Sequence, residues 1–284
     1  DKGNHKAIYD YKRAYVLLKK MGFELNGVDF DMLLGAYVLN PSITKNEFKM
    51  VASSFNYYKL KFDEEVYGKG AKRVIPAPKV LMEHVISKVE CLYLIKNQII
   101  DELIANDQYE LLSQIEIPLS RVLGKMEFEG IKVDLDELQR QKKDLEERIS
   151  FIESEVYRLA GENFNIASPK QLGVVLFEHL GLPYSKKTKT GYSTEQSILE
   201  EVKHLHPVVE YILNYRMLTK LYQTYIVGLN EQIFADHKCH TIYEQALTQT
   251  GRLSSIEPNL QNIPIRTEQG RLIRKMFIPT NKDN

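Results

Sequence analysis

Guanidinium and carboxamide side chains gather between Thr248 and Arg266, in the stretch TQTGRLSSIEPNLQNIPIR. The groups are those of Arg252, Asn259, Gln261, Asn262 and Arg266. Such side chains reach the base edges and the sugar–phosphate oxygens of nucleic acids. Gly251, Pro258 and Pro264 break regular structure, so no helix or alternating strand is expected here. The residues alone leave two interpretations open, a nucleic-acid contact and an ordinary polar surface loop.

The run TGRLSSIEPNLQNIPIR closely resembles the segment that precedes the first catalytic aspartate in the palm domain of bacterial family A DNA polymerases. The resemblance covers Tyr9–Pro279. It implies that Arg252 and the three amides reach the DNA minor groove near the primer end, and that Arg266 also contacts DNA. Hydrogen-bond acceptors in that groove are nearly independent of sequence, so such groups can test base-pair geometry without reading the sequence.

The resemblance also implies how the chain is divided. Residues 1–107 resemble the C-terminal part of a 3′–5′ exonuclease domain with a ribonuclease-H-like fold. Residues 108–239 resemble a helical thumb that grips DNA, and residues 240–284 resemble the start of the palm. The expected fold is mainly α with minor α/β structure, because strands and helices alternate only weakly in the first segment.

The exonuclease reaction of the family needs two metal ions held by several carboxylates. The second exonuclease motif is Asn-x-x-x-Asp, and here Lys6 stands at the asparagine position while Asp10 keeps the aspartate. The third motif is Tyr-x-x-x-Asp, and Val85 and Val89 replace both of its residues. Because valine cannot hold a magnesium ion, we expect a vestigial, structural exonuclease domain without a metal site. An active exonuclease is kept as an alternative.

A basic loop, YSKKTKTGYST, spans Tyr184–Thr194 and contains hydroxyl groups but no acidic residue. Its lysines are Lys186, Lys187 and Lys189. Such a loop can bind backbone phosphates without reading the sequence, although a solvated loop tip has the same composition. The resemblance to the thumb tip of the family favours phosphate binding by these lysines together with Ser193 and Thr194.

A long helix is predicted over Val208–Leu229, with Arg216, Lys220 and either Gln223 or Thr224 at steps that place them along one face. A basic line on a helix can follow a DNA backbone, or it can simply be solvated. In the family, the matching basic residues of this helix touch the primer-side backbone. The resemblance therefore makes Arg216 and Lys220 candidate phosphate contacts.

Hydrophobic periodicity and end signals predict the remaining elements. Helices are expected over Lys6–Lys20, Asp31–Asn40, Leu81–Leu103 and Gln108–Phe128, between Asp134 and Gly161, and from starts at Ser168 and at Ser193 with Gln196. Strands are expected over Leu25–Phe30, Ile131–Val133 and His240–Leu247, with a turn and strand over Glu268–Phe277. The helix after Asp134 carries a heptad-like apolar stripe, so we expect it to form one arm of an antiparallel hairpin.

Composition limits the class of protein. The chain has 284 residues and a formal net charge of zero, so nucleic-acid contacts must come from local basic patches. The two cysteines lie far apart, which argues against a disulfide framework or a zinc cluster and fits a reducing cytosol. No apolar run is long enough to cross a membrane, and the first residues do not resemble a signal peptide. A cytoplasmic protein without a membrane partner is therefore expected, and the resemblance implies that it associates with the nucleoid.

The resemblance implies that the parent protein is a DNA-directed DNA polymerase that acts in replication and repair. It would add deoxynucleotides to a primer 3′ end with Mg²⁺. The palm aspartates that hold the metal, and the fingers that bind deoxynucleotides, are expected beyond Asn284, and Asp283 has no supporting pattern. We therefore expect this chain to bind primer–template duplex, with no catalytic residue and no Mg²⁺ of its own. The alternative is a stand-alone, non-catalytic module that binds duplex DNA.

Overall fold

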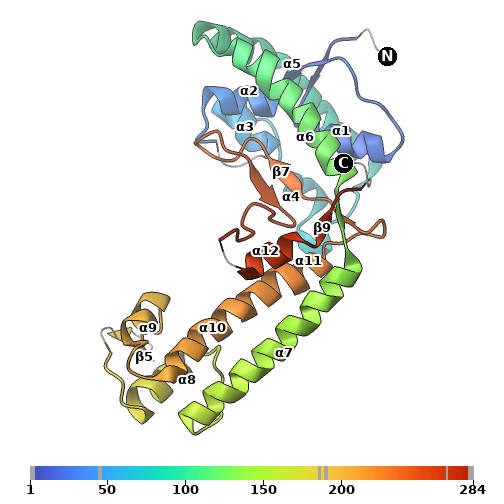
Figure 1. Cartoon of the computed structure of the whole chain (residues 1–284). Helices are drawn as coiled ribbons and strands as arrows, with labels where there is room; N and C mark the ends of the chain where they lie inside the picture. Colours follow the sequence, from blue (N-terminus) through green and yellow to red (C-terminus); the bar gives the residue numbers. More distant parts are fainter. Residues whose placement is uncertain (1–3, 44–46, 185–186, 189–190, 267, 281–284) are drawn as a thin grey trace. The chain divides into compact units, whose positions relative to one another are not determined.

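The computed structural model describes residues 4–43, 47–184, 187–188, 191–266 and 268–280 (Figure 1). The contacts divide the chain into two compact units. Unit 1 comprises Asp1–Gly130 and His240–Asn262, and unit 2 comprises Ile131–Cys239 and Ile263–Asn284. Residues 108–130 thus pack within unit 1. That they belong functionally to a thumb domain stays a prediction.

Unit 1 is mainly helical. Its helices are α1 (Tyr11–Lys20), α2 (Met32–Leu39), α3 (Phe48–Ser54), α4 (Asp63–Tyr67), α5 (Pro78–Ala105) and α6 (Ile117–Glu129), with a 3₁₀ turn η1 (Gly70–Lys72) and a π-helical segment η2 (Leu111–Glu116). Its strands are β1 (Lys6–Ile8), β2 (Val28–Asp31), β7 (Ile242–Glu244) and β8 (Ser254–Ile256). Strand β1 pairs in parallel with β2, and β7 pairs antiparallel with β8.

The helix predicted over Lys6–Lys20 is wrong at its start, because Lys6–Ile8 is a strand. Asp10 adopts a left-handed backbone with φ 57° and caps α1, since its carboxylate accepts the N–H of Arg13 at 3.1 Å. The start predicted for α2 is confirmed: the carboxylate of Asp31 accepts the N–H of Leu33 at 2.9 Å.

The core of unit 1 is formed mainly by the packing of α2 on α5 and of α6 on α1. Helix α2 is buried along almost its whole length, and its large buried neighbours include Ile99 and Leu103 of α5. Helix α6 packs on α1 through Gly124, where a Cβ atom would lie 2.8 Å from Cδ1 of Tyr15. The helices predicted over residues 81–103 and 108–128 are confirmed, the second with its π-helical segment.

The stretch predicted to be irregular contains a strand, which is a second correction. Ser254–Ile256 forms β8 and pairs with β7, so that Ile242 lies opposite Ile256 and Glu244 opposite Ser254. The strand predicted over His240–Leu247 is present but shorter. Three-residue strands of this kind are defined by their partner more than by their own alternation, so periodicity does not reveal them.

Unit 2 is built on two long helices. Its helices are α7 (Leu135–Ala160), α8 (Pro169–Val174), α9 (Gln196–Val202), α10 (Pro207–Leu221), α11 (Gly228–Asn230) and α12 (Glu268–Arg274), with π-helical segments η3 (Val175–His179) and η4 (Tyr222–Val227). Its strands are β3 (Ile131–Val133), β4 (Lys187–Thr188), β5 (Gly191–Tyr192), β6 (Lys238–Cys239) and β9 (Phe277–Ile278). Strand β3 lies between β6 and β9, and β4 pairs with β5.

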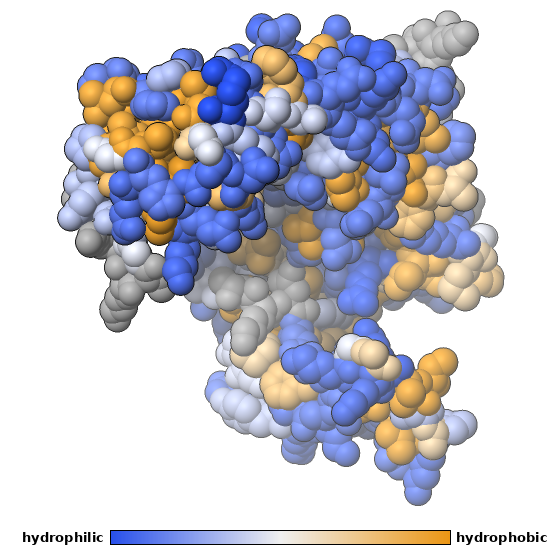
Figure 2. Space-filling model, turned by 90° about the horizontal axis from the view of Figure 1, so that it is seen from below, coloured by the Kyte–Doolittle hydropathy of each residue, from blue (hydrophilic) through white to orange (hydrophobic). Residues whose placement is uncertain are grey.

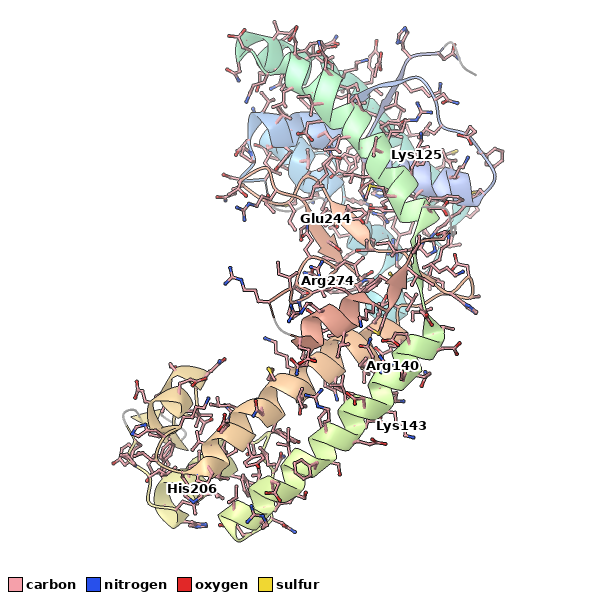
Figure 3. The ribbon with its side chains drawn as sticks, in the orientation of Figure 1. Lys125, Arg140, Lys143, His206, Glu244 and Arg274 are labelled. Carbon is pink, nitrogen blue, oxygen red and sulfur yellow. The ribbon has the colours of Figure 1, made fainter. Side chains whose placement is uncertain are left out.

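Helices α7 and α10 run side by side in opposite directions, which confirms the predicted antiparallel hairpin (Figure 1). Asp134 caps α7 by accepting the N–H groups of Asp136 and Glu137 at 3.1 Å each, and Gly161 ends it at φ 76°. Charged side chains such as Arg140 and Lys143 cover the exposed face of α7 (Figure 3).

Two predicted elements of unit 2 are present but need correction: the helix expected from Ser193 and Gln196 is α9, and the strand expected to end at Phe277 is β9, which begins there. Glu268–Arg274 is the helix α12 rather than a turn, and Gly270 in it is required because a Cβ atom would lie 2.2 Å from the carbonyl oxygen of Pro264. Helix α9 begins after Glu195, without a side-chain cap from Ser193. Ser168, in contrast, caps α8 as predicted.

Hydrophobic side chains also reach the surface among the hydrophilic ones (Figure 2). Large exposed examples on α5 are Met82, Ile86, Val89 and Tyr93. Within the described residues, no helix combines the length and the apolar composition that crossing a bilayer requires.

Candidate nucleic-acid interface

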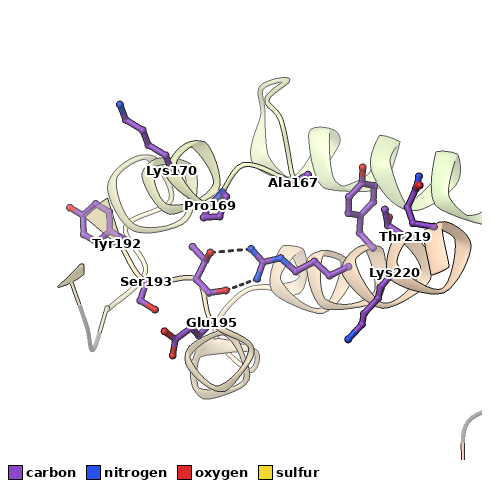
Figure 4. Close-up of a pocket in the computed structure, with 12 residues that line it drawn as sticks. Ala167, Pro169, Lys170, Tyr192, Ser193, Glu195, Thr219 and Lys220 are labelled. Carbon is purple, nitrogen blue, oxygen red and sulfur yellow. Dashed lines mark hydrogen bonds between the residues drawn. The ribbon is translucent and has the colours of Figure 1, made fainter. Parts of the chain in front are cut away.

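A hollow of about 580 Å³ lies in unit 2, between the start of α8, the segment that follows β5, and α10 (Figure 4). Three basic residues line it, namely Lys170 of α8 and Arg216 and Lys220 of α10, and Glu195 is the acidic residue among its lining. Lys170 and Lys220 are exposed, and neither forms an ion pair within the described part of the chain. The hollow therefore carries a local positive charge in a chain whose net charge is zero.

Arg216 is bound inside this hollow. Its guanidinium donates one hydrogen bond to the backbone oxygen of Thr194 and another, at 3.0 Å, to the Oγ1 atom of the same residue. Burial lowers the pKa of Arg216 from its very high ordinary value. Ser193 and Thr194 are only 4% and 5% exposed. These two predicted contacts thus lie beneath the surface, whereas Thr224, in η4, is exposed.

The predicted tip lysines are described only in part. Lys186 and Lys189 lie outside the described residues, and Lys187 is described through its backbone in β4. The hairpin β4–β5 places Lys187 opposite Tyr192. The ring of Tyr192 packs on Phe177 and Tyr184, at centroid distances of 5.2 and 4.9 Å.

In unit 1, the loop after β8 is held by its own polar side chains. The carboxamide of Asn259 accepts the N–H of Gln261 at 3.0 Å, and the Gln261 amide donates to the backbone oxygen of Leu253 at 3.2 Å. The side chain of Asn262 is exposed on the same loop, and that of Arg252 is exposed just before β8, next to Leu253. The structure thus brings four predicted groups of unit 1 together, while Arg266 is an exposed residue of unit 2.

A buried pair of hydroxyl groups supports this loop. Oγ1 of Thr241 lies 2.7 Å from Oγ of Ser255, and the two hydroxyls hydrogen-bond to the backbone oxygen of Pro258 at 2.8 and 3.2 Å. The Ser255 oxygen also accepts the N–H of Leu260 at 3.1 Å. Neither residue could be predicted from the sequence, because single hydroxyls near a predicted strand resemble solvated ones.

A buried ion pair lies where β7 meets α6. Nζ of Lys12 is 2.5 Å from Oε1 of Glu127, and the same carboxylate accepts the N–H of Tyr243 at 2.7 Å. The Lys12 and Glu127 side chains are 11% and 8% exposed. Burial raises the pKa of Glu127, and its bonds to Lys12 and Tyr243 oppose that shift.

The degenerate exonuclease positions have structural partners. The Lys6 ammonium donates to the backbone oxygens of Asn4 and Asn26 at 2.9 Å each, and Asp10 caps α1. Val85 and Val89 are exposed on α5. Across the described ranges, no three His, Cys, Asp or Glu side chains are grouped as metal ligands.

Asp31, next to these positions, is a helix cap in a buried place. Besides the α2 N–H groups, its carboxylate accepts the N–H of Tyr11 at 2.7 Å and that of Asp10 at 3.2 Å. Burial raises the pKa of Asp31 to about 7, against the effect of these hydrogen bonds. The carboxylate therefore ties α1 to α2 rather than facing solvent.

Two family models match the chain. The model of DNA polymerase family A matches residues 135–284, and that of the ribonuclease H-like domain of DNA polymerase I matches residues 1–95. DNA polymerase I of Bacillus subtilis is 50% identical over 98% of this chain, and that of Geobacillus stearothermophilus is 49% identical over 100% of this chain. The chain spans about a third of the length of these curated relatives, 32% of each.

A solved structure is also similar: the POL domain of Pol1 from M. smegmatis, in complex with DNA primer-template and dNTP. It is 35% identical with a TM-score of 0.83, and the match covers 98% of this chain and 46% of that one. The ribonuclease H-like remnant expected at the N-terminus agrees with the family model found there. The model of DNA polymerase family A matches more than half of the residues of this chain. The chain therefore belongs to DNA polymerase family A.

Proposed function

We propose that this chain is the part of a DNA polymerase I that grips the primer–template duplex. The observation that carries the proposal is the hollow of unit 2, where Lys170, Arg216 and Lys220 face a single acidic lining residue, Glu195. Phosphate binding by such a local patch needs no overall basic charge. The basic loop with Lys186, Lys187 and Lys189 would extend the same phosphate-binding surface.

In unit 1, we propose that Arg252, Asn259, Gln261 and Asn262 contact the minor groove. The bonds of Asn259 and Gln261 within the loop hold these groups in place before DNA arrives, which lowers the entropy lost on binding. Arg266 would contact the DNA from unit 2. The acceptors of the minor groove differ little between base pairs, so this surface would bind duplexes of any sequence.

The parent reaction would be template-directed addition of deoxynucleotides to a primer 3′ end, with Mg²⁺ and the nucleotide bound outside the described residues. DNA as the partner also implies a cytoplasmic, nucleoid-associated location. We expect residues 1–284 alone to bind duplex without extending the primer. Extension by this chain in an assay with Mg²⁺ and four deoxynucleotides would contradict that expectation.

The duplex-binding proposal is tested by titrating a fluorescent primer–template at several salt concentrations. Lys170→Met/Lys220→Met removes two charges from the hollow, and the slope of log affinity against log salt should fall by about 1.8, or roughly 0.9 per lost phosphate contact. Lys143→Met is the matched control, because Lys143 is 80% exposed on α7 and does not line the hollow. Equal slopes for the double variant and the control would refute the assignment.

A further inference from the structure

Arg216 differs from the other cations of the hollow in what it binds. Two of its N–H donors are used by Thr194, one on the backbone oxygen and one on the hydroxyl (Figure 4). Lys220, one helical turn further along α10, is exposed and forms no ion pair with a described residue. The Arg216 guanidinium is held in one orientation by its two hydrogen bonds to Thr194. The Lys220 ammonium, on an exposed and flexible side chain, can turn towards a ligand.

Thr194 lies in the short connection between β5 and α9. It follows β5 by two residues and directly precedes Glu195, the residue at the N-cap position of α9. The bond from Arg216 therefore fixes the point at which the chain leaves the hairpin β4–β5 and enters a helix. Thr194 is only 5% exposed, which limits the access of water that could replace the guanidinium.

The strand before this connection, β5, is fixed as well. Tyr192 packs against α8 so closely that a Cβ atom on Gly173 would lie 3.0 Å from the Cβ of Tyr192. Its ring contacts Phe177 as described above. The strand β5 is thus fixed by an aromatic contact at Tyr192 and by a charged hydrogen bond at Thr194.

We propose that Arg216 is a positioning residue for the hairpin β4–β5, which it holds through its two bonds to Thr194. Arg216 would set where the end of β5 stands beside the hollow, which Tyr192 and Thr194 line. The proposal rests on the proposed binding of duplex DNA for its functional meaning. Its structural half, the link from Arg216 to the hairpin through Thr194, holds without DNA.

Hydrogen–deuterium exchange of the free protein tests the structural half. Arg216→Met, and Arg216→Lys, which keeps the charge but loses the two-pronged geometry, should both speed exchange in residues 187–194 by about tenfold, the factor expected for one lost charge-assisted hydrogen bond. Thr194→Val, which removes only the hydroxyl, should give a smaller increase. Lys220→Met is the matched control and should leave this segment unchanged. Unchanged exchange in Arg216→Met would overturn the proposal.

Binding of the fluorescent primer–template tests the functional half. Lys220→Met should lower the salt slope by about 0.9, the value for one phosphate contact. Arg216→Lys should weaken binding as much as Arg216→Met, and adding Thr194→Val to Arg216→Met should weaken it no further. Wild-type affinity in Arg216→Lys would show that charge alone matters at this position and would overturn the proposal. If the wild-type chain does not bind the duplex at all, the proposed function fails while the exchange result still decides the role of Arg216.

Discussion

Lys12→Met would isolate the contribution of the buried ion pair to the stability of unit 1. The substitution keeps most of the side-chain volume but leaves the Glu127 carboxylate with the Tyr243 N–H as its partner among the contacts described for it. Removing one partner of a buried pair costs about 3–5 kcal/mol, because the remaining charge loses its counter-charge in a place that is largely shielded from water. A loss of that size is a large fraction of the stability of an ordinary domain.

The loss should depend on pH in a definite direction. Burial already raises the pKa of Glu127, and removing Lys12 would raise it further. A carboxyl with a raised pKa in the folded state stabilises it most at low pH, and that contribution is lost as pH rises through the raised value. The loss of stability in Lys12→Met should therefore be larger at pH 8 than at pH 5.

Urea unfolding followed by circular dichroism measures both effects. Lys20→Met, on an exposed position of the same helix, is the matched control and should change the free energy of unfolding by less than about 0.5 kcal/mol. Lys12→Met/Glu127→Gln should recover most of the loss, because a neutral amide still accepts the Tyr243 N–H. A loss below about 1 kcal/mol in Lys12→Met, or one that is equal at both pH values, would refute this account of the pair.

Two further predictions concern single contacts. The hydrogen bond from the Arg140 guanidinium is the main cause that lowers the pKa of Glu137 to about 2. The pair therefore stabilises the fold at pH values above the ordinary pKa of a glutamate, and this stabilisation is lost as the pH falls towards 2. Because Arg140 is largely exposed, Glu137→Gln should lower the melting temperature only slightly at pH 7 and progressively less below pH 4, and a decrease that is the same at every pH would contradict this. Gly124→Ala should cost about 1–3 kcal/mol, since the new methyl group would meet the Tyr15 ring, and an unchanged melting temperature would count against that contact.

Local signals predicted the elements whose causes are local. The helix α7 has a capping aspartate at Asp134, a regular apolar stripe and a stop at Gly161, and all three act within the segment itself. The start of α2 at Asp31 was found in the same way, because the cap and the helix are adjacent in sequence. Such elements can be predicted without knowing what they pack against.

The elements that were mispredicted depend on distant partners. Lys6–Ile8 has the composition of a helix start, and it becomes a strand because Val28–Asp31 pairs with it. Helix α12 contains Gly270, and glycine has a low intrinsic helix propensity. A glycine is needed there because the backbone of Pro264 passes too close for a side chain.

The same limit applies to the candidate site. The charged residues Lys220 and Arg216 were identified from their spacing, but spacing does not distinguish a cation that faces solvent from one that is bound by Thr194. Lys170 was missed because it follows an ordinary helix cap. The pair Thr241 and Ser255 was missed because only the folded hairpin brings the two hydroxyls together.

The division into units has a consequence for how the chain is made. Each unit is assembled from two separate stretches, so the polypeptide passes from one to the other after Gly130, Cys239 and Asn262. During synthesis, unit 1 cannot acquire β7 and β8 until the ribosome has released more than a hundred residues that belong to unit 2. Pairing over such separations is slow to form, so the first unit would emerge with an incomplete surface and would be sensitive to proteases until the later stretch arrives.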